Sequence, residues 1–149
     1  MSTETIHRDQ NQFCTFHVDQ FFFGVEVSKV QEVVRQQALT RVPLAPREVS
    51  GLMNLRGQIV TAIDLHRRLG LPERSGGQPC MNVLISTEDG AVSLLVDRIE
   101  DVLSVEPDSV EPAPETLQVE LRRFIRGVSK QKDRLLLILD DAKAMDLSA

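Results

Sequence analysis

The chain has 149 residues, is 42% hydrophobic and 26% charged, and carries a formal net charge of -5 at pH 7. This length suits one domain or two very small ones, and the composition permits both a core and solubility. The negative charge argues against a nucleic-acid-binding surface, because affinity for phosphates depends on clustered Lys and Arg. The sequence shows no signal peptide and no apolar run long enough to cross a bilayer, so we expect a cytosolic protein.

The N-terminal part of the chain predicts a tail followed by strands. Residues 1–12 are polar and predict a disordered tail. Residues 13–18 and 21–27 are rich in aromatic and β-branched side chains, which favour strands. Residues 28–35 predict a short helical turn that continues into a strand, and residues 47–52 predict one helical turn.

The clearest local signal is a hairpin. Arg56 and Gly57 join two strand-like segments, residues 52–55 and 58–63. A two-residue link that contains Gly is typical of a hairpin turn, where the backbone needs positive φ. Asp64 follows as a predicted N-cap of a short helix.

The second half of the chain begins after a Gly- and Pro-containing linker at residues 71–79. It predicts a further series of strands, an irregular proline-rich segment at residues 106–115, and a C-terminal helix at about residues 140–146. The strands are predicted at residues 81–87, 91–96, 98–105, 124–128 and 134–139.

The two halves resemble each other. Residues 25–34 align with residues 94–103, with charged positions matching as well as apolar ones. Residues 51–64 align with residues 127–140 in the same way. This second alignment superimposes a turn glycine and a strand-end aspartate: Gly51 on Gly127 and Asp64 on Asp140. Because these special positions coincide, we interpret the pattern as an internal duplication.

A repeated unit of about five strands suits a small closed barrel, which leaves no exposed edges. We therefore predict a mainly β fold with short helices, in which two five-stranded barrels pack side by side. One barrel is predicted within residues 13–70 and the other within residues 80–139. Because a lone unit of this size is only marginally stable, the two barrels must share apolar surface.

Catalytic chemistry has little support in the sequence. His7, His17 and His66 have no metal-ligand spacing, and Cys14 and Cys80 form no Cys-x-x-Cys motif. We expect two reduced, buried thiols, no metal, no cofactor and no enzymatic activity. An enzyme or small-ligand barrel is the alternative, and it would require a polar pocket with perturbed titrating groups.

Two features remain as interaction candidates. Arg56 projects from the predicted hairpin tip, where it is either an ordinary solvated side chain or an interface anchor. The segment 25–34 is rich in valines that cannot all point into one small barrel: Val27, Val30, Val33 and Val34. They form either an exposed partner site or part of the seam between the two lobes.

The hairpin region also resembles a known family. Residues 49–60, Val-Ser-Gly-Leu-Met-Asn-Leu-Arg-Gly-Gln-Ile-Val, are followed by Ile-Asp-Leu at residues 63–65. This run is similar to the central signature of the CheW family, the coupling proteins of bacterial chemotaxis. Weaker matches extend over about residues 13–145, nearly the whole chain.

This resemblance implies SH3-like barrels and a scaffold that bridges chemoreceptors to the histidine kinase CheA. It implies a cytoplasmic protein recruited to receptor arrays at the inner membrane, and it is compatible with self-association in rings. A related pathway, such as control of pilus motility, is the alternative.

The resemblance also assigns residues to two faces. The receptor tip would dock in the groove between the lobes, close to the hairpin turn. Its contacts would be Asn54, Leu55, Arg56 and Gly57 by direct match, with Val102 from the second half. The kinase would meet apolar residues of the first half: Val27, Val30 and Val33, with Cys14 nearby.

Overall fold

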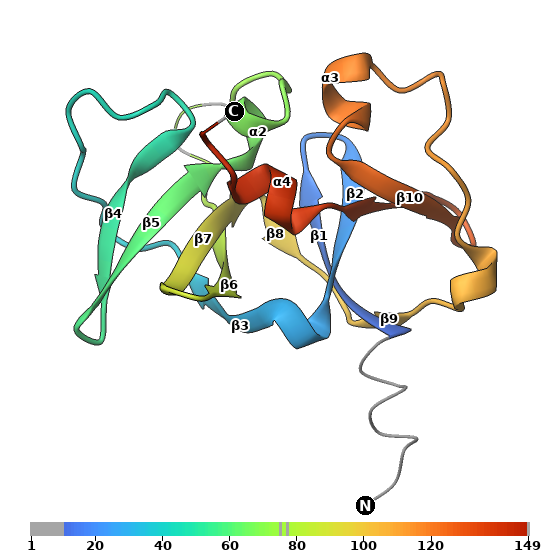
Figure 1. Ribbon diagram of the computed structural model, residues 1–149, viewed down its shortest axis with the longest axis horizontal. Coiled ribbons are helices and arrows are strands. Elements are labelled where there is room, and N and C mark those ends of the chain that lie inside the picture. The colour runs from blue at the N-terminus through green and yellow to red at the C-terminus, as the bar shows by residue number, and fades with distance from the viewer. Residues whose placement is uncertain (1–10, 75, 77, 149) are drawn as a thin grey trace, which may run out of the picture.

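Figure 1 shows the computed structural model, which describes residues 11–74, 76 and 78–148. The first ten residues of the predicted tail lie outside the described part. Most of the regular structure is β-strand, which confirms the predicted class. None of the described helices has the length and apolar character needed to cross a membrane. The strands are β1 (Gln12–Val18), β2 (Phe21–Glu26), β3 (Val30–Arg35), β4 (Val49–Leu55), β5 (Gln58–Asp64), β6 (Met81–Thr87), β7 (Gly90–Val96), β8 (Arg98–Ile99), β9 (Leu103–Ser104), β10 (Ile125–Lys130) and β11 (Leu135–Leu139).

The helices are short and connect or cap these strands. Asp64 and Asp140 accept hydrogen bonds from backbone N–H groups of the following helix, as the sequence predicts for N-caps. The described helical segments are η1 (Val27–Lys29), α2 (Leu65–Arg68), η2 (Pro107–Ser109), α3 (Val119–Arg122) and α4 (Asp141–Met145).

The strands assort into two sheets, each of which forms one SH3-like lobe. The middle lobe has five strands in the order β3-β6-β7-β5-β4. The terminal lobe has six strands in the order β10-β11-β2-β1-β8, and β9 also pairs with β1. The chain therefore starts in the terminal lobe, crosses to the middle lobe through η1, and returns after β7.

The predicted division into barrels at residues 13–70 and 80–139 differs from this arrangement. β1 and β2 pair with strands from the end of the chain, and β6 and β7 pair with β3 and β5. The sequence repeat identifies segments that resemble each other, but it does not say which strands pair. The β1–β2 hairpin of the first half pairs with β11 of the second half, and the β6–β7 hairpin of the second half pairs with β3 and β5 of the first half. Each hairpin thus completes the barrel of the other half.

Strand register supports the duplication. In the alignments of the two halves, Thr61 corresponds to Leu137, and extending the first alignment by two residues places Phe23 on Val92. The structure pairs Thr61 with Val92 in parallel strands, and it pairs Leu137 with Phe23 in the same manner. Equivalent residues therefore form equivalent pairs, as expected for two copies related by an internal two-fold axis.

Equivalent bridges join the two edges of each sheet. Thr40, which follows β3, pairs with Leu52 of β4, and Glu111 pairs with Val128 of β10. These approaches require glycine beside them. A Cβ on Gly51, whose φ is +154°, would lie 2.7 Å from the Thr40 carbonyl oxygen. The predicted helical turn at residues 47–52 is wrong, because this segment enters β4 and pairs with β5.

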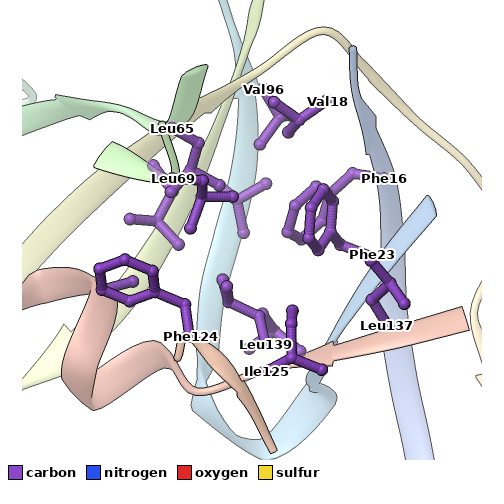
Figure 2. Close-up of a cluster of buried hydrophobic side chains, with 14 of the residues drawn as sticks. Phe16, Val18, Phe23, Leu65, Leu69, Val96, Phe124, Ile125, Leu137 and Leu139 are labelled. Atoms are coloured by element: carbon purple, nitrogen blue, oxygen red, sulfur yellow. The ribbon is translucent and has the colours of Figure 1, made fainter. Parts of the chain in front are cut away.

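A large apolar cluster, here called the shared core, lies between the lobes (Figure 2). Phe16 and Phe23 stack within it, with ring centroids 5.9 Å apart. Successive residues along a strand face alternately the shared core and the interior of a barrel. Both faces of the strand are therefore apolar, which explains the continuous apolar runs in the sequence. Phe23 and Leu94 face the shared core, whereas Phe22 and Leu95 face barrel interiors. The prediction that the barrels share apolar surface is confirmed.

Candidate protein-interaction site

The β4–β5 turn has the predicted hairpin geometry. Arg56 and Gly57 have φ values of 53° and 86°, as a two-residue hairpin turn with two left-handed residues requires. The Asn54 side-chain oxygen accepts a hydrogen bond of 2.9 Å from the Gly57 backbone N–H. Asn54 therefore holds the turn that presents Arg56 to solvent.

Arg56 makes an ion pair that the sequence analysis did not predict. Its guanidinium contacts the Glu32 carboxylate on β3, although β3 and β4 are opposite edges of the sheet order. The sheet must therefore curl until its two edges meet. The Arg56 side chain is 66% exposed and that of Glu32 is 28% exposed, so much of the guanidinium remains available to a partner.

The other residues assigned to the receptor differ in accessibility. Leu55 is buried and supports the turn from inside the lobe. Val102 is exposed but belongs to the terminal lobe, just before β9. Ile59 was not predicted as a contact, yet it is 60% exposed and lies opposite Asn54 in the β4–β5 register. Successive side chains of a strand point to opposite faces, so alternation along residues 58–63 is the signal that could have identified Ile59 as outward-facing.

The residues assigned to the kinase are less accessible. Cys14 is buried, and burial raises the pKa of its thiol. Val30 and Val33 are half-buried and pack against the shared core. Val27 is half-buried in η1, where the chain crosses between lobes. The structure thus places the inner atoms of Val30 and Val33 at the lobe seam, one of the two alternatives.

The terminal lobe contains an arginine clamp comparable to the Arg56–Glu32 pair. Arg134 donates hydrogen bonds of 2.9 and 2.8 Å to the two oxygens of Glu100, and its guanidinium lies 3.7 Å from the centroid of the Phe22 ring. His17 also contacts Glu100. The hydrogen bonds from Arg134 are the main reason that the pKa of Glu100 falls to about 2.

A second charged network joins the lobes. His66 of α2 hydrogen-bonds to Asp97 at 2.8 Å and to the Pro72 carbonyl at 2.7 Å, while Arg74 and the Asp19 backbone N–H donate to Asp97. Burial raises the pKa of Asp97, but these hydrogen bonds outweigh burial and lower it overall. Asp97 connects the tip of the β1–β2 hairpin to the middle lobe, and the hydrogen bonds of this connection are the cause of its lowered pKa.

An inter-lobe cavity of about 420 Å³ lies at the end of the molecule that carries α2 and α3. The β1–β2 turn, residues 70–72, residues 116–118 and Leu121 line it. None of the hairpin residues 54–57 takes part. In Figure 1 the β4–β5 turn, β3 and β9 lie on the lower side, away from α2 and α3. The hairpin tip and this cavity are therefore separate features.

A family model described as the CheW-like domain matches residues 12–148. The chain belongs to the CheW-like domain family. Among its relatives, the chemotaxis protein CheW of Treponema pallidum is 30% identical over 139 residues, which cover 91% of this chain and 82% of the relative. The chemotaxis protein CheW of Bacillus subtilis is 34% identical over 124 residues, covering 83% of this chain and 80% of the relative.

A solved structure shares the CheW-like fold. The scaffolding protein TtCheW of Thermoanaerobacter tengcongensis superimposes with a TM-score of 0.82 at 24% sequence identity, and the match covers 93% of this chain and 90% of that chain. The sequence-based assignment to the CheW family, made from the hairpin signature, is confirmed by the family match.

Proposed function

We propose that this chain is a non-catalytic adaptor that couples chemoreceptors to the histidine kinase CheA in the cytoplasm. Its membership of the CheW-like domain family supports this proposal, as do its relatives named chemotaxis protein CheW. The observation that carries it is the β4–β5 turn, an ordered hairpin tip with an exposed arginine. Arginine is a favoured anchor at protein interfaces because its planar group makes several hydrogen bonds.

The receptor face would centre on Arg56, with Asn54 and Gly57 fixing the turn. Ile59 adds exposed apolar surface beside Asn54, and Val102 adds a second apolar contact from the terminal lobe. A helical receptor tip placed along the lower side of Figure 1, from the β4–β5 turn towards β9, would then bury these apolar side chains beside the Arg56 guanidinium. Such an arrangement, an apolar surface with one charged anchor, is common at the centre of interfaces.

The kinase face would lie on η1 and the outer side of β3. Val27, Val30 and Val33 are half-buried, so only their outer atoms are available to a partner. Cys14, being buried, would support this face from inside the terminal lobe rather than touch the kinase. The two faces adjoin at β3, where Glu32 contacts Arg56, so Val27 of η1 is the kinase-face position to mutate separately from the receptor face.

A three-component co-sedimentation assay with receptor and CheA fragments tests the proposal. We expect Arg56→Glu to weaken receptor binding at least tenfold while kinase binding is retained. We expect Val27→Lys to do the reverse. The free energy of unfolding of Arg56→Glu should fall by only about 1 kcal/mol or less, because an exposed ion pair contributes little.

The double variant Glu32→Arg with Arg56→Glu is the matched control, because it restores an ion pair with reversed charges. Receptor binding that stays weak in the double variant supports direct contact by Arg56. Recovery of binding would mean that the ion pair itself, and not the guanidinium, is required. Normal receptor binding by Arg56→Glu would contradict the proposed receptor face.

A further inference from the structure

His66 is a buried histidine whose two ring nitrogens both face hydrogen-bond acceptors. Only 4% of its side chain is exposed. Nδ1 lies 2.7 Å from the Pro72 carbonyl oxygen, and Nε2 lies 2.8 Å from a carboxylate oxygen of Asp97. A carbonyl oxygen and an ionised carboxylate accept hydrogen bonds but donate none. Each ring nitrogen must therefore supply the proton of its own hydrogen bond.

Asp97 does not supply a proton to the ring. Burial raises the pKa of its carboxyl group, but hydrogen bonds from His66, Arg74 and the Asp19 backbone outweigh burial and leave that pKa lowered. Asp97 is therefore ionised at neutral pH. A neutral imidazole has one N–H and one lone pair, so here its lone pair would face an oxygen atom. The geometry fits an imidazolium, which donates from both nitrogens.

Charged and titratable groups surround His66 on each element packed against it. Asp64, the last residue of β5, accepts a hydrogen bond from the His66 backbone N–H and lies 3.8 Å from Arg67 of α2. Among the residues that the structure describes, Asp97 is the carboxylate in contact with the ring, so it is the group that favours the second ring proton. The remaining groups are Arg74, which donates to Asp97, Glu73, which pairs with Arg67, and Cys80, whose thiol pKa is raised by burial.

His17 provides a comparison within the same chain. Its Nε2 also contacts a carboxylate, that of Glu100. Within the described residues, its Nδ1 has no hydrogen-bond partner. A neutral His17 ring with one N–H can therefore satisfy this contact, whereas a neutral His66 ring satisfies only one of its two contacts.

The two partners of His66 adjoin the inter-lobe cavity of about 420 Å³. Leu71 and Pro72 form one part of the cavity wall, and Asp19, whose backbone N–H donates to Asp97, belongs to the part formed by the β1–β2 turn. The Leu71 N–H also donates to the His66 carbonyl oxygen at 2.8 Å. His66 therefore ties both parts of the wall to α2.

We propose that His66 is a pH-dependent switch at the lobe junction, closed when both ring nitrogens carry protons and released at Pro72 when one proton is lost. The remaining N–H stays with Asp97, because a hydrogen bond to a charged acceptor is the stronger one. The Nδ1 lone pair then faces the Pro72 carbonyl oxygen and repels it, so the segment around Pro72 moves away from α2 and the inter-lobe cavity widens.

The direction of the switch follows from the chemistry of imidazole. Histidine is the side chain whose charge ordinarily changes between about pH 5 and pH 8. The lobe junction is therefore closed at the lower end of this range and looser at the upper end. The inference does not depend on the proposed receptor or kinase contacts.

Nuclear magnetic resonance of the full nitrogen-15-labelled chain provides the test. Long-range proton–nitrogen spectra report how many protons the His66 ring carries, and amide exchange reports the state of the junction. We expect the ring to pass from two protons to one as the pH rises through this range. With the same midpoint, protection of the Leu71 N–H, corrected for the pH dependence of exchange in a free chain, should fall at least tenfold. Amides of β6 and β7 should keep their protection.

Three variants separate the switch from a merely structural role. His66→Gln should abolish the pH dependence of Leu71 protection, and His17→Gln, the matched control, should retain it. In Asp97→Asn the new amide can donate to Nε2, so a neutral ring satisfies both partners. We expect His66 in Asp97→Asn to carry one proton, and Leu71 to stay protected, at pH values where the unmodified ring carries two. Asp97→Asn keeps the test decisive if His66→Gln does not fold.

Two results would overturn the proposal. The first is a single ring proton on His66 of the unmodified chain at about pH 5, the lower end of the range. The second is Leu71 protection that does not depend on pH in the unmodified chain, or whose pH dependence persists unchanged in His66→Gln.

Discussion

The exchange of hairpins between halves, together with the shared core, predicts that the two lobes unfold as one unit. Phe23→Ala is the sharpest perturbation. Phe23 is fully buried, stacks on Phe16, and sits on a strand that pairs with both β1 and β11. Removing a buried Phe side chain costs about 3–5 kcal/mol. Since a domain is stable by only about 5–15 kcal/mol, this change removes a large share of the total.

Urea unfolding followed by circular dichroism, with hydrogen exchange measured by mass spectrometry, checks this prediction. For Phe23→Ala we expect one transition at a lower midpoint with an unchanged slope, because the area exposed on unfolding is nearly the same. Hydrogen exchange should accelerate in both lobes by a similar factor, since the slowest amides exchange by global unfolding.

Phe22→Ala is the matched control, because it removes the same side chain from the same strand but from the interior of the terminal lobe. Because the lobes unfold as one unit, we expect the slowest amides of both lobes to exchange faster in Phe22→Ala too, and only amides that exchange by local opening should respond more strongly in the terminal lobe. Two separate urea transitions, or faster exchange confined to the terminal lobe in Phe23→Ala, would refute the view that the shared core couples the lobes.

Two further predictions concern charge and backbone. The pKa of Glu100 is about 2 in the folded chain against 4.5 for the free side chain. Its stabilising effect is therefore complete above pH ~4.5 and is lost as the pH falls towards ~2. The difference in Tm between the unmodified chain and Glu100→Gln should shrink over that range, and a constant difference would argue against the Arg134 clamp. Gly51→Ala should lower the free energy of unfolding by about 2 kcal/mol or more, because its Cβ would clash with the Thr40 carbonyl. Gly57→Ala, with φ of +86° but no atom within 4 Å of the new Cβ, should cost less, and equal losses would contradict the clash.

Local features of this chain could be predicted from sequence because their causes are local. The Arg56-Gly57 turn follows from the need for positive φ, and the caps at Asp64 and Asp140 follow from the unpaired N–H groups at a helix start. The duplication was also visible, because special backbone positions recur with the apolar pattern.

Features that depend on distant partners could not be predicted. The pairing of β2 with β11 joins segments from opposite ends of the chain. A sequence repeat is consistent both with hairpins that stay in their own half and with hairpins that are exchanged between the halves. Helix α3 has only four residues, too few to show a helical period. The Arg56–Glu32 ion pair arises only when the sheet curls, and no spacing in the sequence indicates that curvature.

The path of the chain also has a consequence for synthesis. All five strands of the middle lobe lie between residues 30 and 96, so their pairing partners are complete before residues 97–149 have been translated. β2 instead lacks its neighbour β11 until residues 136–138 have been translated. The β1–β2 hairpin, which is made before the middle lobe, is thus among the last elements to gain all its partners, and during that interval its apolar edge needs protection from aggregation.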